Sequence, residues 1–210
     1  MGGPGPASGA VSRWLAWVAV AVGLLVCASV LFPVFFHHWS SVSAPSSGTV
    51  ADLRRVPVDD LLLAVASQVP IGPRLPSPAD AVLRASDSVR VGPDGRLQAV
   101  AAAPVTPASL VSGDPLASLA FSSFAHVDAL LVAHQATRQD AYLVAARDQL
   151  LAYARYERHA WLQRGFLWND HAIAARVGVV IRFWAVYRSH PSFDEAVAAE
   201  LLLHVRRCVD

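Results

Sequence analysis

The stretch Phe166-Leu167-Trp168-Asn169-Asp170-His171-Ala172-Ile173-Ala174-Ala175-Arg176 opens the most regular helical pattern in this chain of 210 residues. It contains the only asparagine of the sequence, and it gathers Trp, Asn, Asp, His and Arg in a chain otherwise dominated by Ala, Val and Leu. These polar and aromatic side chains are therefore the first candidates for contact with a substrate.

The periodicity after this opening predicts a helix from about Asn169 to Ser189. Five apolar side chains fall within one stripe of about 100° and are expected to face the core: Ile173, Val177, Val180, Ile181 and Trp184. The opposite side carries His171, Ala175, Gly178 and Arg182. These small residues between His171 and Arg182 either let a partner approach the helix closely or simply form a solvated face.

The start of the same helix also has a structural explanation. Asn169 or Asp170 is expected to cap it, and a carboxylate in the first turn complements the helix dipole. An exposed helix N-terminus favours anions, so the same place suits a carboxylate or sulfate group. Trp168 is placed either to stack on a sugar ring or to pack as a hydrophobic staple.

The fold class expected from the remaining pattern is mainly α. Helices are predicted over residues 114–137, 139–160 and 169–189, with a fourth from a capping box at Ser192 to the C-terminus. Short links predict antiparallel helical hairpins, stacked rather than closed into a bundle.

Shorter elements are expected before this helical region. A helix is predicted over Asp59 to Gln68, and another begins after Ser77 as N-cap. A small β-hairpin is predicted near residues 88–100, around Gly92-Pro93-Asp94-Gly95, as a surface ornament.

The N-terminal third indicates a membrane anchor. Residues 1–13 are expected to be disordered, and the 23 residues from Trp14 to Phe36 carry no charge. At 1.5 Å per residue such a helix is about 34 Å long, enough to cross a bilayer. A cleaved signal peptide, cut near Ser41 to Ala44, is the alternative. Arg13 precedes the span and favours a cytoplasmic N-terminus, with the C-terminal domain outside the cytoplasm.

The rest of the chain then divides in two. Residues 37–113, including a Ser/Pro linker over 40–48, are expected to form a linker and a small mixed segment. Residues 114–210 are expected to form the helical domain.

Composition excludes several classes of function. The formal net charge is +1 and all 17 basic residues are arginine, so a nucleic-acid role has no electrostatic support. Two cysteines predict no disulfide framework. The sequence has no zinc-type spacing and no phosphate-binding glycine loop, so neither a metal nor a cofactor is expected.

The residues Asp140-Ala141-Tyr142-Leu143, followed by Phe166 to Ala172 and Arg176, resemble a known family. They are similar to the N-terminal α/α toroid of heparinase II/III-like and alginate-lyase-like polysaccharide lyases. The family's Trp-x-Asp-His-Ala/Thr-x-x-x-Arg pattern corresponds here to Trp168, Asp170, His171, Ala172 and Arg176. The resemblance covers roughly residues 114 to 210 and implies an incomplete toroid.

The resemblance implies β-elimination on an anionic, uronic-acid-containing polysaccharide. In the family a Tyr or His removes the proton at C5, and Asn, His or Arg neutralises the substrate carboxylate. The family's later Asn-His segment, catalytic Tyr and β-sandwich do not occur within these 210 residues, so no catalytic residue is expected here. The expected cleft residues are Trp168, Asn169, Asp170, His171, Arg176 and Arg182.

Two functions are therefore expected. The first is the N-terminal portion of a membrane-anchored lyase, completed by a C-terminal part or a second chain. The alternative is a non-catalytic, membrane-anchored helical protein that binds carbohydrate or acts as a scaffold.

Overall fold

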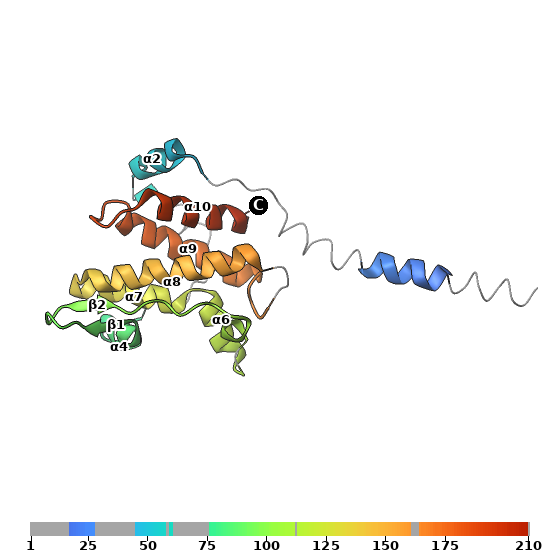
Figure 1. The fold of residues 1–210 in the computed structure, drawn as a ribbon, viewed down its shortest axis with the longest axis horizontal. Coiled ribbons are helices and arrows are strands. Elements are labelled where there is room, and N and C mark those ends of the chain that lie inside the picture. The colour runs from blue at the N-terminus through green and yellow to red at the C-terminus, as the bar shows by residue number, and fades with distance from the viewer. Residues whose placement is uncertain are drawn as a thin grey trace, which may run out of the picture. The chain divides into compact units, whose positions relative to one another are not determined.

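The computed structural model describes residues 17–27, 45–57, 59–60, 76–111, 113–160 and 164–209. Over these residues the protein is mainly helical, with one small antiparallel sheet of two strands. The chain divides into two units, Met1–Ser40 and Ser41–Asp210. The predicted mainly α fold class with a small hairpin is confirmed (Figure 1).

Helix α8 (Asp140–His159) is the centre of the larger unit. It packs against α7 (Ala125–Thr137), α9 (Asp170–Tyr187) and α10 (Glu195–Val209). Two residues join α7 to α8, so the chain reverses direction there and the pair forms a helical hairpin. The fully buried apolar side chains of this core include Leu110, Phe124, Leu130, Leu143, Leu150, Tyr153, Leu167, Phe183, Tyr187 and Leu201.

The predicted single helix over residues 114–137 is wrong, because the chain breaks it in two. Asp114 caps α6 (Pro115–Ser122), as expected, by accepting a hydrogen bond from the Leu116 amide. Phe124 then takes a left-handed backbone with φ of 61°, and α7 starts at the next residue. The Phe124 ring is fully buried. The free energy gained by burying this ring offsets the cost of the left-handed backbone. The hydropathy pattern does not predict a helix break at such a residue.

The core face of α9 also differs from the prediction. Val180 and Trp184 are buried as expected, but Ile173, Val177 and Ile181 are only half-buried. The buried positions follow a neighbouring stripe: Ala172, Arg176, Val179, Phe183 and Tyr187. This stripe contains Arg176. A hydropathy pattern places an arginine on the solvent side, so the pattern predicted the wrong core face.

The start of α10 lies three residues later than predicted. The Asp194 carboxylate accepts hydrogen bonds from the Ala196 and Val197 amides and caps the helix. Ser192, the predicted cap, instead offers its carbonyl to the Tyr187 hydroxyl. Ser192 and Asp194 are both residue types that cap helices. The Tyr187 hydroxyl contacts the backbone of both residues, and Asp194 is the one that caps α10.

Residues 76–111, within the predicted linker and mixed segment, form regular elements. Ser77 caps α4 (Pro78–Ala85), as predicted, and a short 3-10 turn, Ser86–Ser88, leads into the hairpin. Strand β1 (Val89–Val91) pairs with β2 (Leu97–Ala99), with Arg90 opposite Gln98. Gly95 has φ of 75° in the turn, where a side chain would be strained.

The hairpin is not a surface ornament. Its inner side chains Val89, Leu97 and Ala99 pack against the main core. The Gln149 side-chain amide of α8 donates to the Ser88 hydroxyl at 2.9 Å. A short helix, α5 (Pro107–Leu110), follows the hairpin and buries Leu110.

The predicted linker over residues 40–48 ends inside a helix. Ser46 caps α2 (Ser47–Arg55), and Val50 of α2 packs against Trp184 and Ala198. The Arg54 guanidinium lies 4.1 Å from the centre of the Phe193 ring. Residues 45–57 therefore belong to the packed helical unit.

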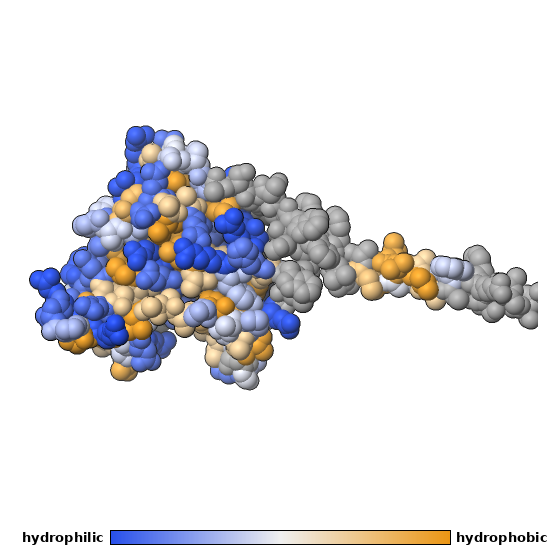
Figure 2. Space-filling view, in the orientation of Figure 1, coloured by the Kyte–Doolittle hydropathy of each residue, from blue (hydrophilic) through white to orange (hydrophobic). Residues whose placement is uncertain are grey.

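The smaller unit contains the helix Trp17–Cys27, which lies within the predicted anchor and exposes apolar side chains such as Leu24 and Leu25 (Figure 2). Among the described residues, no single helix has both the length and the apolar character to cross a membrane. The bent pair α6 and α7, at 58°, passes that test together by length and composition.

Several predictions lie outside the described residues. These are the disorder predicted for residues 1–13, the remainder of the predicted 14–36 span, the alternative cleavage near Ser41 to Ala44, and most of the helix predicted over Asp59 to Gln68.

Candidate functional site

The predicted motif divides between the surface and the interior. Asn169 caps α9, because its side-chain oxygen accepts hydrogen bonds from the amides of His171 and Ala172 at 3.1 and 3.2 Å. Asp170 lies in the first turn and is exposed, and so is His171. The capping role predicted for one of Asn169 and Asp170 is thereby confirmed for Asn169.

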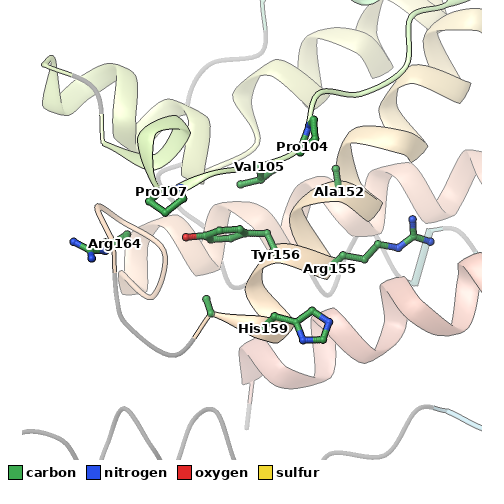
Figure 3. A pocket seen from close by; sticks show the side chains of 9 residues that line it. Pro104, Val105, Pro107, Ala152, Arg155, Tyr156, His159 and Arg164 are labelled. Carbon is green, nitrogen blue, oxygen red and sulfur yellow. The ribbon is translucent and has the colours of Figure 1, made fainter.

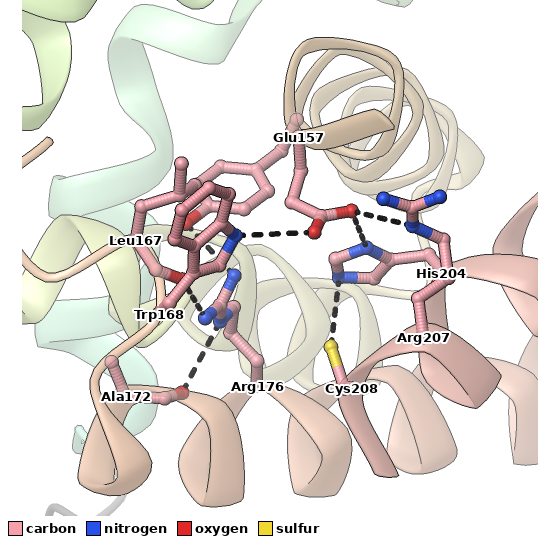
Figure 4. A network of polar contacts seen from close by, with 9 residues as sticks. Glu157, Leu167, Trp168, Ala172, Arg176, His204, Arg207 and Cys208 are labelled. Atoms are coloured by element: carbon pink, nitrogen blue, oxygen red, sulfur yellow. Dashed lines mark hydrogen bonds and ion pairs between the residues drawn. The ribbon is translucent and has the colours of Figure 1, made fainter. Parts of the chain in front are cut away.

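Arg176 lies in the interior, with 1% of its surface exposed (Figure 4). Its guanidinium donates to the Tyr153 hydroxyl at 2.9 Å, to the Leu167 carbonyl, and to the Ala172 carbonyl at 3.4 Å. Arg176 therefore links α9 by hydrogen bonds to the turn before it and to α8.

Glu157 is a second buried ionisable side chain of this network of polar contacts (Figure 4). One of its oxygens accepts a hydrogen bond from the Trp168 indole at 3.3 Å. The other lies 3.4 Å from Arg207 Nε and 3.7 Å from His204 Nδ1, both on α10. Trp168 is half-buried and packs against the main core, so its ring is part of the joint between α8, α9 and α10.

His204 and Cys208 form a coupled pair at the end of this network. The His204 Nε2 atom lies 3.9 Å from the Cys208 sulfur. Burial lowers the pKa of His204, but attraction to Cys208 and Glu157 outweighs burial and raises the pKa to about 9. Burial raises the pKa of Cys208, and the nearby His204 cation more than offsets this and lowers it.

Arg182, the last predicted cleft residue, is held by Asp128 of α7. Two of its nitrogens lie 3.0 and 2.8 Å from one carboxylate oxygen of Asp128, which is almost fully buried. The contacts of the six predicted residues thus lie in separate places. Trp168 and Arg176 share one network, Asp170 and His171 face solvent, and Arg182 pairs with a different helix.

An open groove lies instead along the C-terminal half of α8 (Figure 3). It encloses about 570 Å³. Its described lining comes from α8, from the start of α5 and the segment before it, and from the turn before α9: Pro104, Val105, Pro107, Ala152, Arg155, Tyr156, His159, Ala160 and Arg164. We call this the α8 groove.

The Tyr156 ring lies in the middle of the α8 groove, with Arg155 and Arg164 on either side of it (Figure 3). Arg155 makes two hydrogen bonds to Glu200, at 2.9 and 3.0 Å, and is partly neutralised. The guanidinium of Arg164 makes no hydrogen bond or ion pair within the described part of the chain. Arg164 is therefore the cation best placed to accept an external anion.

Gly165 fixes the position of Arg164. Its φ is 51°, and a Cβ there would collide with the Leu110 carbonyl oxygen of α5. The turn after α8 therefore needs glycine to lie so close to α5. This close approach holds one wall of the groove against the other.

A second pocket of about 290 Å³ adjoins the α8 groove and shares Val105 and Ala152 with it. The remaining lining residues are Ala103, Phe121, His126, Gln149 and Tyr153. The hydroxyl of Tyr153 is the same group that Arg176 holds. Arg176 thereby positions Tyr153, a residue that lines this second pocket. We call this second pocket the inner pocket.

Neither pocket was predicted from the sequence. Arg155, Tyr156 and His159 recur at helical spacing on α8 and could have been singled out as one polar stripe. The other wall, from Ala103 to Pro107, has no periodic pattern and its place depends on the fold. Among the described residues, no cluster of three or more His, Cys, Asp or Glu side chains could hold a metal ion.

Comparison with known proteins gave no match to a family model, to a curated protein or to a solved structure.

Proposed function

We propose that the chain binds an anionic, uronic-acid-containing polysaccharide in the α8 groove. The observation that carries this proposal is an open groove that combines a central tyrosine with Arg164, Arg155 and His159. Arginine recognises carboxylates and sulfates through paired, charge-assisted hydrogen bonds. An aromatic ring with an apolar face and a polar tip suits a sugar, which also has both.

The wider proposal is that this chain supplies the N-terminal, incomplete α/α-toroid part of a heparinase II/III-like lyase. It rests on the likeness of Trp168, Asp170, His171, Ala172 and Arg176 to the motif of that family. In this proposal residues 14–36 anchor the protein in a membrane, with the helical domain outside the cytoplasm. β-Elimination would need groups from a C-terminal part or a second chain.

A specific observation supports the alternative, a binding protein without catalysis. Arg176 and Trp168 are occupied by structural contacts with Tyr153, Leu167 and Glu157. The motif therefore builds the helical joint behind the groove, a role that requires no chemical step.

Binding is tested with the full chain in detergent and a hexasaccharide of a homopolymeric uronate, measured by calorimetry. We expect Arg164→Ala to weaken binding roughly tenfold, since it removes one charge-assisted contact. Arg84→Ala is the matched control: it removes the same charge from an exposed position on α4, and it should leave affinity within twofold. Equal affinity in all three proteins would contradict the groove as the binding site.

Catalysis is tested separately by incubating the chain with alginate-like and heparin-like polymers and following the absorbance of unsaturated uronate. Product formation would support the lyase and exclude the binding-only alternative. Binding without product from this chain, and product only when a C-terminal part is added, would support the divided lyase. Binding without product in both cases would favour the alternative.

A further inference from the structure

Cys208 belongs to a cluster of ionisable side chains apart from the lining of the α8 groove (Figure 4). Its sulfur lies 3.9 Å from His204 Nε2, and Nδ1 of the same ring lies 3.7 Å from a Glu157 carboxylate oxygen. His204 and Cys208 are four residues apart on α10, so they share one face of that helix. Glu157 comes from α8. Thiol, imidazole and carboxylate therefore stand in the order that activates a cysteine nucleophile.

The charges around the sulfur favour its ionised form. Burial raises the pKa of Cys208, but attraction to His204 and Arg176 outweighs burial and repulsion by Glu157, so the pKa is lowered. Burial lowers the pKa of His204, and Cys208 and Glu157 raise it to about 9. Tyr153 also interacts with Cys208, and burial raises the pKa of this tyrosine to about 12, so it stays neutral near pH 7. A thiolate beside an imidazolium is therefore the expected pair.

The two cations are needed because of where Cys208 lies. It is in the last turn of α10, and the dipole of a helix disfavours an anion at its C-terminal end. His204 comes from the same helix, and Arg176 comes from α9. The thiolate is therefore stabilised by contacts that only the packed helices provide.

Cys208 also differs from the groups behind it in its exposure. His204 and Glu157 are 3% and 2% exposed, whereas Cys208 is partly exposed. A small molecule from solvent therefore has a route to this residue, while the imidazole and the carboxylate stay in the interior.

We propose that Cys208 is an oxidation site, at which a thiolate paired with His204 is converted by a hydroperoxide to sulfenic acid. The sulfur attacks the terminal oxygen of the hydroperoxide, so an S–O bond forms and the O–O bond breaks. Sulfur gives two electrons to the peroxide, and the leaving alkoxide or hydroxide takes the proton of the His204 imidazolium. The products are Cys208 sulfenic acid, an alcohol or water, and neutral His204. Solvent-accessible thiolates of lowered pKa are the cysteines that react in this way.

The first test is the pH dependence of alkylation by iodoacetamide. It uses the full chain in detergent with Cys27→Ser, so that Cys208 is the single thiol. The same protein unfolded in concentrated urea gives the profile of an ordinary cysteine. We expect the midpoint of the folded protein to lie at least about one pH unit lower, because only the thiolate reacts. A midpoint equal to or above that of the unfolded protein would overturn the proposal.

The second test follows the sulfenic acid. Hydrogen peroxide is added to the same protein at pH 7, and the product is trapped with dimedone and measured by mass spectrometry. We expect His204→Gln to slow trapping about tenfold, because it removes both the cation beside the sulfur and the proton for the leaving oxygen. Arg206→Gln is the matched control: it removes a charge from an exposed position of α10 and should leave the rate within twofold.

The outcomes separate an oxidation site from a buried structural thiol. No dimedone adduct on Cys208, or equal trapping rates with and without His204, would overturn the proposal. Circular dichroism shows whether His204→Gln is folded. If it is not, the folded and unfolded profiles of the first test decide, because they leave the buried network unchanged. Neither result bears on the proposed polysaccharide site, since Cys208 and His204 do not line the α8 groove.

Discussion

His126 and His204 have opposite protonation preferences although both lie near the Phe124 ring, 6.3 and 6.1 Å away between ring centroids. Burial without a nearby carboxylate lowers the pKa of His126 to about 4. His204 is also buried, yet Cys208 and Glu157 raise its pKa to about 9. Neither assignment follows from the sequence, because both depend on which side chains the fold places beside the ring.

The depressed pKa of His126 predicts a loss of stability in acid. The unfolded value is 6.5 and the folded value about 4, so the unfolded chain binds this proton first as pH falls. The stability contributed by the neutral ring is therefore present above pH 6.5 and is lost as pH falls through about 4. Over this window the loss from His126 is up to about 3 kcal/mol.

Urea unfolding at pH 7 and at pH 4 measures this effect. His126→Phe should remove that share of the acid destabilisation and flatten the curve relative to wild type. Acid destabilisation of the same size in both proteins would show that His126 is not the group responsible.

At the scale of single elements, two helix caps and the hairpin turn were predicted correctly. Ser77 and Asp114 cap their helices as their sequences indicated, and the Pro-Asp-Gly turn produces the hairpin. Element ends and breaks were predicted less well. The break at Phe124 arises because a buried ring holds its residue in a left-handed backbone, which no local propensity favours.

The Asn169 cap yields a prediction on α9. Asn169→Ala should lower the free energy of unfolding by about 1 kcal/mol, because the amides of His171 and Ala172 lose their acceptor. Asn169→Asp retains an acceptor and should stay within a few tenths of wild type. Thermal unfolding followed by circular dichroism measures both.

The same variants distinguish capping from ligand contact. If Asn169 only caps the helix, Asn169→Ala keeps its affinity for uronate oligosaccharides at temperatures where it is folded. A loss of affinity without a loss of stability would restore Asn169 as a cleft residue.

At the scale of the whole molecule, the contact between α8 and α9 depends on Arg176. Arg176→Met should destabilise the protein by roughly 3 kcal/mol, because the Tyr153 hydroxyl and two carbonyls lose a buried donor. Arg158→Met changes an exposed arginine at the end of α8 and should stay within about 0.5 kcal/mol. Chemical denaturation compares the two, and equal stability would contradict the role assigned to Arg176.

Only part of the candidate site was predictable from the sequence. The stretch around Trp168 to Arg176 was recognised as unusual, and the structure places it at the joint of three helices. The α8 groove was missed because its two walls lie about fifty residues apart in the sequence, at Val105 and Tyr156, and only packing brings them together. The burial of Arg176 was not predicted either, because two of its three partners are backbone carbonyls, which no side-chain pattern reveals.

Helix α8 contributes to several parts of the molecule at once. Leu143 and Leu150 lie in the core, Glu157 lies in the network with His204 and Arg207, and Gln149 and Tyr156 line the two pockets. A substitution on α8 that alters ligand preference therefore also disturbs its neighbours.

The opposite wall of the α8 groove, from Ala103 to Pro107, should tolerate substitution better than α8. It is mostly exposed, and only Val105 packs against the core. Divergence and engineering of ligand preference should therefore concentrate in this five-residue segment, while α8 stays constant. Loop exchange over 103–107 is the most economical route to a protein of the same fold that selects a different polymer.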